Sequence, residues 1–239
     1  MRLFQNSNPV IRSVKTDSVI SSDQVTYMSV AFRTLVLIGL AVISAFLTIY
    51  YLASFGVNVF IGVMIGAFIV GFISVIVGTR SVRLAPFFAV LYALSEGVIL
   101  GFVSAMYAGI YAGIVPAAIM TTVIVLLVMM LLYSTGIIKV TSRFASILVV
   151  ALISVIVMSI VPMLFQSILY SGFYFLICGI SAVLSALFLL LDFESIKTCV
   201  DMGTDAKYGW VLALGLMVTL VWIYFEVLRL LAIFSRSRK

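Results

Sequence analysis

Three carboxylates stand within, or at the ends of, long apolar stretches of this sequence, where ionised side chains are rare. They are Glu96, Asp192 and Glu226, out of eight acidic residues in the chain. An ionised carboxylate at the centre of a bilayer helix costs about 2.5 to 3.5 kcal/mol, so such residues normally face a partner, a cavity or an ion path. We therefore take these three residues as the leading candidates for function.

The stretch that contains Glu226 also carries a one-sided polar stripe. Its members are separated by three, four and three residues, so that a helix places them on one face: Thr219, Trp222, Glu226 and Arg229. A hydroxyl, an acid and a base that face the bundle interior suit a gated ion path, and we expect this last helix to be central in the bundle. A buried contact between helices would give the same pattern, and Glu226 could instead pair with Arg229 on its own helix.

The depth of each carboxylate follows from a rise of about 1.5 Å per residue. Glu96 and Glu226 come to a similar depth, roughly 20 and 24 Å from the cytosolic edge. We expect them to face each other or a common water-filled cavity and to share one charge that binds a cation transiently. Asp192 is expected at the end of its helix, about 33 Å from the outer edge and at the cytosolic interface.

The composition identifies the solvent of this chain as mostly lipid. Of 239 residues, 65% are hydrophobic and 9% are charged, with a mean hydropathy of +1.36. About 25% charged residues is usual for a soluble domain. There is no histidine and the two cysteines have no metal-binding spacing, which removes the commonest metal ligand and general base. We expect an all-α polytopic membrane protein that is not an enzyme and has no cofactor beyond a cation bound transiently at the three carboxylates, since hard cations prefer oxygen ligands.

Seven apolar segments follow a polar N-terminal tail, and each is close to the ~20 residues that cross a bilayer. Residues 1–33 are expected to form the cytosolic tail, and residues 34–239 the seven-helix transmembrane domain. The segments span residues 34–54, 57–78, 84–107, 110–133, 145–165, 170–191 and 210–234.

Lysine and arginine orient the seven segments. They gather in the tail and in alternate loops, whereas the intervening short loops carry no charge; the tail and loop residues are Arg2, Arg12, Lys15, Arg33, Arg80, Arg83, Lys139, Arg143, Lys197 and Lys207. The N-terminus is therefore expected in the cytosol, and the net charge of +6 is read as topology rather than nucleic-acid binding. Seven full spans would place the four C-terminal basic residues outside, and a last segment that turned back would place them inside.

Several strings resemble the bacterial branch of the Bax inhibitor-1, or transmembrane Bax inhibitor motif, family. They are LLLDFESIK, LALGLMVTLVWIYFEVLRLLAIF, SEGVILG and SNPVIRS. The resemblance implies a pH-sensitive leak of cations, chiefly Ca²⁺, in which two Asp residues share protons beside a basic residue. Asp192 matches the first Asp and Arg80 the basic residue, whereas Thr219 stands where the family has its second Asp.

The resemblance and the carboxylates together suggest a protein of the bacterial plasma membrane that passively conducts cations. Asp192 would pair with Arg80 while ionised and hold a gate shut. Two alternatives stay open: a regulatory protein that binds a membrane protease or another membrane-protein partner, and a proton-coupled transporter. The expected partners are thus the lipid bilayer, cations and a second membrane protein, with no nucleic acid.

The charge pattern yields a topological prediction. The N-terminal tail and the positions of Arg80, Arg143 and Lys197 should face the cytosol, because basic residues are retained on that side. A cysteine at position 143 or 197 should therefore react with a membrane-impermeant maleimide only after the cells are opened. Labelling of either cysteine from outside intact cells would show that the protein has the opposite orientation.

Overall fold

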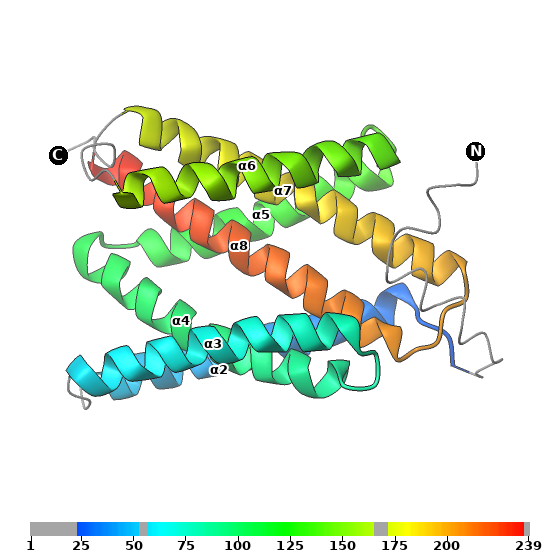
Figure 1. Ribbon diagram of the computed structural model, residues 1–239, viewed down its shortest axis with the longest axis horizontal. Helices are drawn as coiled ribbons and strands as arrows, with labels where there is room; N and C mark the ends of the chain where they lie inside the picture. The colour runs from blue at the N-terminus through cyan, green and yellow to red at the C-terminus, as the bar shows by residue number, and fades with distance from the viewer. Residues whose placement is uncertain (1–22, 53–56, 165–171, 237–239) are drawn as a thin grey trace. The chain divides into compact units, whose positions relative to one another are not determined.

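The computed structural model describes residues 23–52, 57–164 and 172–236, which form seven long helices (Figure 1). All seven are long and apolar enough to cross a membrane. Within the described residues, extended pairing is confined to an isolated bridge between Gln24 and Asp205. The prediction of an all-α polytopic membrane protein is thereby confirmed. The helices are α2 Tyr27–Leu52, α3 Val57–Arg80, α4 Ala85–Ile110, α5 Ile114–Ser134, α6 Ser142–Leu164, α7 Gly172–Asp201 and α8 Tyr208–Arg236.

Helix α7 is longer than the sequence pattern suggested. It continues to Asp201, whereas the apolar segment was expected to end at residue 191 in a polar loop. The helix persists because Ile196 and Cys199, one turn apart, are buried although polar residues surround them. Asp192 consequently lies nine residues before the helix end, about 14 Å into α7, and the expectation that it marks the helix end was wrong.

Helix α2 begins at Tyr27, seven residues before the expected first segment. Thr26 and Ser29 start it with a reciprocal cap, in which each side-chain oxygen accepts a hydrogen bond from the other residue's backbone N–H at 3.2 Å. Arg33, expected in the tail, lies inside this helix, and its guanidinium sits 5.4 Å from the centre of the Trp210 ring.

The described chain divides into two compact units. The first unit contains the described residues up to 105 together with residues 195–217, and therefore α2, α3, most of α4, the end of α7 and the start of α8. Within it α4 packs closely against α2, because a Cβ built at Gly97 would collide with the Ala41 carbonyl oxygen. Ser44 strengthens this contact by donating a 2.7 Å hydrogen bond to the carbonyl of Leu94. Helices approach closely here because the glycine has no side chain.

Two glycines of α3 have the same four-residue spacing but no such role. No described atom lies within 4 Å of a Cβ built at Gly62 or Gly66. In the described part of the protein, the four-residue glycine spacing therefore marks a close helix contact at Gly97 and Gly101 but not at Gly62 and Gly66. The spacing permits a close contact, and only a neighbouring helix creates one.

The second unit contains residues 106–194 and 218–239, and so α5, α6, most of α7 and the second half of α8. Here α7 and α8 run antiparallel, and aromatic pairs mark their register. Phe175 stacks against Phe234 at 5.5 Å between ring centres, and Phe188 against Trp222 at the same distance. These contacts fix which α7 residues face which α8 residues.

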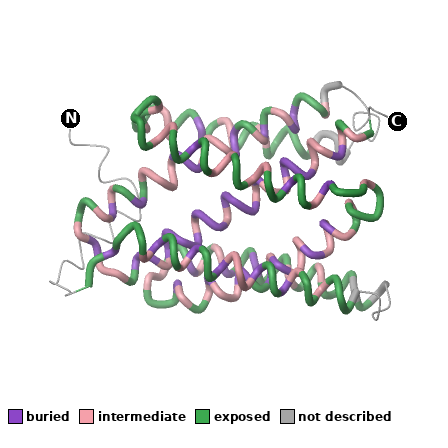
Figure 2. Tube along the Cα trace, turned by 180° about the vertical axis from the view of Figure 1, so that it is seen from behind, coloured by how far each residue is buried: buried purple, intermediate pink, exposed green. Residues whose placement is uncertain are grey.

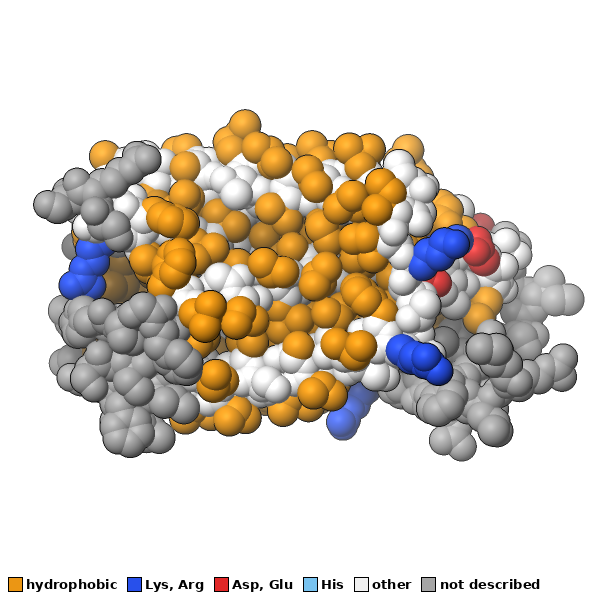
Figure 3. Space-filling model, turned by 90° about the horizontal axis from the view of Figure 1, so that it is seen from above, with side chains coloured by type: hydrophobic (Ala, Val, Ile, Leu, Met, Phe, Trp, Pro, Cys, Tyr) orange, Lys and Arg blue, Asp and Glu red, His pale blue; other side chains and the backbone are white. Residues whose placement is uncertain are grey.

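Helix α8 is the most buried helix, as expected for the central helix of a bundle. Over an apolar stretch of 18 residues, 72% of the residues of α8 are buried, against 6 to 39% over the corresponding stretches of the other six helices. Figure 2 shows buried residues along most of the α8 trace. The other helices expose apolar side chains, which cover the middle of the face in Figure 3 while charged side chains gather toward its ends. This distribution suits a protein surrounded by lipid.

The two glycine pairs provide a matched test of helix packing. Gly97→Ala should lower the free energy of unfolding by about 1 to 3 kcal/mol, because its methyl group collides with the Ala41 backbone. Gly62→Ala, with open space at its Cβ, should be neutral or stabilising by up to about 1 kcal/mol through helix propensity. Unfolding in mixed detergent micelles, followed by circular dichroism, measures both. Equal stabilities of the two variants would contradict the contact.

Candidate functional site

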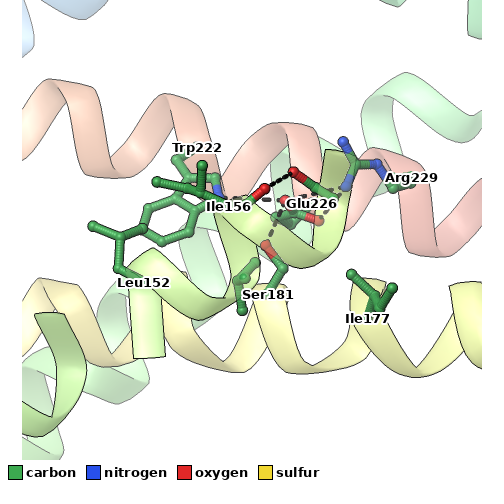
Figure 4. A pocket seen from close by; sticks show the side chains of 9 residues that line it. Leu152, Ile156, Ile177, Ser181, Trp222, Glu226 and Arg229 are labelled. Carbon is green, nitrogen blue, oxygen red and sulfur yellow. Dashed lines mark hydrogen bonds and ion pairs between the residues drawn. The ribbon is translucent and has the colours of Figure 1, made fainter. Parts of the chain in front are cut away.

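Glu226 of α8 is buried, with 5% of its surface exposed, and three donors surround its carboxylate. Ser181 of α7 donates a 2.7 Å hydrogen bond to Oε1. The indole N–H of Trp222 donates to the same oxygen at 3.3 Å. Arg229 forms an ion pair with Oε2 at 3.2 Å (Figure 4). Such a set satisfies a buried carboxylate without water.

The predicted polar stripe of α8 is thus real, and its partners come from α7. The interpretation in which Glu226 pairs with Arg229 on its own helix is confirmed. Arg229 also lies within hydrogen-bonding reach of the Cys178 thiol, which in turn reaches Tyr174. Both belong to α7. The ion pair therefore serves as a contact between two helices as well as within one.

Asp192 and Thr219 form a second polar contact between the same helices. The Thr219 side chain lies within hydrogen-bonding reach of the Asp192 carboxyl group. Thr219 is buried, with 6% of its surface exposed. The Oδ2 atom of Asp192 is also buried, but no described residue donates a hydrogen bond to it. This carboxyl is consequently only half satisfied, in contrast to that of Glu226.

The contacts of Asp192 and Glu226 belong to one continuous line, which we call the α7–α8 seam. From one end to the other it pairs Asp192 with Thr219, Phe188 with Trp222, Ser181 with Glu226 and Cys178 with Arg229. Thr219 and Glu226 are two helical turns apart, about 10 Å. The seam thus places two carboxylates and several hydroxyls along one helix interface inside the membrane-spanning region.

Glu96 and Arg80 lie in the first unit, apart from the seam. Glu96 is half-buried on α4, and its Oε2 would be 3.8 Å from a Cβ at Gly71 of α3. Arg80 is exposed and is the last residue of α3. The expected pairs, Glu96 with Glu226 and Asp192 with Arg80, join residues of different units and stay predictions.

A resident metal centre is not built into the described part of the chain. No three histidine, cysteine, aspartate or glutamate residues come together there. Both cysteines, Cys178 and Cys199, are buried free thiols. A Ca²⁺ ion at Asp192, Glu96 or Glu226 would therefore rely on hydroxyls, backbone carbonyls and water for its remaining ligands, because it takes six to eight oxygens.

Sequence reasoning missed the α7 residues of the seam other than Asp192, namely Cys178, Ser181 and Phe188, and of these Ser181 binds a carboxylate directly. It looks unremarkable among the serines of the chain, but it precedes Asp192 by 11 residues, which is three helical turns. Ser185 precedes Asp192 by seven residues, two turns, on the same side. A search for small polar residues at helical spacing from Asp192 would have indicated the α7 side of the seam.

A family model described as Bax inhibitor 1 like matches residues 8–236 of the chain. The match covers nearly the whole sequence, so the chain belongs to this family. No curated protein sequence matches it.

The hydrogen bond between Ser181 and Glu226 can be isolated by a double-mutant cycle. Ser181→Ala and Glu226→Met should couple by about 0.6 kcal/mol, and at most about 1.7, as hydrogen bonds between membrane helices do. Ser185→Ala is the control, because the Ser185 hydroxyl donates to the Ala182 carbonyl of its own helix at 2.8 Å. Its coupling to Glu226→Met should stay below about 0.3 kcal/mol. Equal coupling for the two serines would exclude a specific contact.

Proposed function

We propose that this member of the Bax inhibitor 1 like family mediates a passive, pH-sensitive leak of cations, chiefly Ca²⁺, across the plasma membrane. The main observation behind this proposal is the environment of the Oδ2 atom of Asp192. This atom is a buried carboxyl oxygen in a membrane-spanning helix, and no described residue donates a hydrogen bond to it. A buried carboxylate without full compensation must take up a proton, attract a cation or admit water.

The chemistry of the seam suits a hard cation. Ca²⁺ and Mg²⁺ prefer oxygen ligands, and the seam offers carboxyl and hydroxyl oxygens from Asp192, Thr219 and Ser181. The charge of Glu226 is already balanced by Arg229, at 3.2 Å. Asp192 is therefore the seam carboxylate whose charge no described residue balances, and it is the one free to take up a proton. Once it is protonated, neutral oxygens line the path and bind a cation only weakly, which suits a leak because the ion must also leave.

The pH dependence would arise from protonation of Asp192. While ionised, its carboxylate would hold a basic group, for which Arg80 is the residue that fits the family pattern, and keep the path closed. Protonation would remove the charge and weaken that contact. The leak would consequently rise as the pH falls. In this proposal the N-terminus lies in the cytosol, so that the Asp192 end of the seam is nearer the cytosolic surface than the Glu226 end.

Asp192→Asn tests this role. In liposomes that enclose a Ca²⁺ indicator, the variant should leak at a rate that no longer depends on pH. At neutral pH it should leak about tenfold faster than the wild type, since a hydrogen bond to a charged group contributes ~1.5 kcal/mol or more. Asp201→Asn, at the exposed end of the same helix, is the matched control and should keep the wild-type profile. An unchanged pH profile in Asp192→Asn would remove this residue from the sensor role.

Thr219→Asp would restore a carboxylate at the second family position. Because Thr219 already contacts Asp192, the two carboxyl groups would share one site, and their repulsion would favour protonation. The midpoint of the pH-dependent leak should move to higher pH by roughly one unit or more. Thr219→Asn, similar in size but uncharged, should not produce this shift. Identical midpoints for the Asp and Asn variants would place position 219 outside the sensor.

A further inference from the structure

A pocket of about 300 Å³ lies in the second unit, between α6, α7 and α8 (Figure 4). This volume is at the lower end of the range for small-molecule sites, ~300 to 1,000 Å³. Glu226 and Arg229 form part of its wall, together with apolar residues of α6. The pocket therefore joins a polar wall to an apolar one, which is the property of a site for an amphiphile.

The pocket extends from near the membrane surface toward the centre of the membrane. Helices α6 and α8 run in the same direction (Figure 1). Ser159 and Arg229 line the pocket five and seven residues before the ends of their helices, about 8 and 11 Å from those ends. Leu152 and Trp222 line it 12 and 14 residues before the ends, about 18 and 21 Å deep. Arg229 and Ser159 are thus nearer the membrane surface than Leu152 and Trp222 are.

The reachable polar group of the pocket is a donor with positive charge. Glu226 is buried beneath its three donors, whereas 38% of the Arg229 side chain is exposed. Only Nη1 of Arg229 is seen to bind Glu226. A guanidinium has five N–H donors, so the donors of Arg229 that do not bind Glu226 can bind Cys178 and a ligand. A phosphate oxygen is the acceptor that a guanidinium binds best.

The mouth of the pocket meets the lipid. Helix α6 is the least buried helix, because only 6% of the residues in its apolar 18-residue stretch are buried. Ile156, which lines the pocket, is 52% exposed. Helix α8 has 29 residues, about 44 Å, so it extends beyond the ~30 Å hydrocarbon core at one end or both. If α8 is centred, Arg229 lies a few ångströms below the boundary between acyl chains and head groups. A molecule entering here comes from the bilayer itself.

We propose that this pocket binds an anionic phospholipid of the surrounding membrane. The phosphate group contacts the guanidinium of Arg229, and the upper part of one acyl chain lies against Leu152, Ile156 and the ring of Trp222. A zwitterionic lipid offers the same phosphate group but adds an ammonium group, which the guanidinium of Arg229 repels, so we expect it to bind more weakly. The binding site stands on the pocket alone and does not depend on the proposed cation leak.

Trp222 is a built-in reporter for this site. The chain has two tryptophans, so a Trp210→Phe background leaves Trp222 as the sole indole. The full-length protein in phosphatidylcholine nanodiscs would receive increasing fractions of brominated phosphatidylglycerol or brominated phosphatidylcholine, both of which quench nearby indole fluorescence. Half-maximal quenching should need about tenfold less of the anionic lipid, because only the zwitterionic lipid carries an ammonium group that Arg229 repels.

Two variants and one control complete the test. Arg229→Gln should make the two quenching curves coincide, and Ile156→Phe, which fills the pocket, should reduce quenching by the anionic lipid toward that by phosphatidylcholine. Ile153→Phe, an exposed α6 residue that does not line the pocket, should leave the preference intact. Circular dichroism verifies that each variant is folded. Equal quenching by both lipids in the Trp210→Phe protein, or a preference that survives in both Arg229→Gln and Ile156→Phe, would overturn the proposal.

Discussion

A carboxylate inside a membrane helix must obtain its hydrogen bonds from protein, because lipid offers no donors. In this chain that constraint acts at Glu226 of α8, which obtains donors from Trp222 and Arg229 of its own helix and from Ser181 of α7. Ser181 reaches across to Glu226, and Cys178 reaches Arg229. These contacts require one particular antiparallel register of the two helices, the same register that the Phe175–Phe234 and Phe188–Trp222 pairs require. The hydrogen bonds of the buried polar groups and the packing of the aromatic rings thus support the same register of α7 and α8.

The two carboxylates of the seam differ in how completely they are satisfied, and this difference separates structure from proposed function. Glu226 has a serine, an indole and a guanidinium as donors, so its charge is balanced and its geometry fixed. Asp192 has a threonine beside it and one oxygen without a described donor. A fully satisfied group stabilises the helix pair, whereas a partly satisfied one stays responsive to protons and ions. We therefore assign the response to Asp192 and the support to Glu226.

Periodicity and charge predicted the elements well and the contacts less well. Seven apolar segments follow directly from the cost of exposing backbone to lipid, and the stripe of α8 follows from the helical repeat. The end of α7 was missed because Ile196 and Cys199 are buried among polar neighbours, which hydropathy alone reads as a loop. Gly62 and Gly97 have the same spacing pattern but opposite surroundings. The spacing of residues along one helix does not show which neighbouring helix, if any, will contact them.

The central claim is that Asp192 is the group whose protonation changes in the membrane. Infrared difference spectroscopy of the reconstituted protein measures this directly, because a protonated carboxyl group has a carbonyl stretch that a carboxylate lacks. The account predicts a carbonyl band that grows as the pH is lowered, in parallel with the cation leak, and that is missing in Asp192→Asn. A band of unchanged intensity in that variant, or a leak that responds to pH while the band does not, would contradict it.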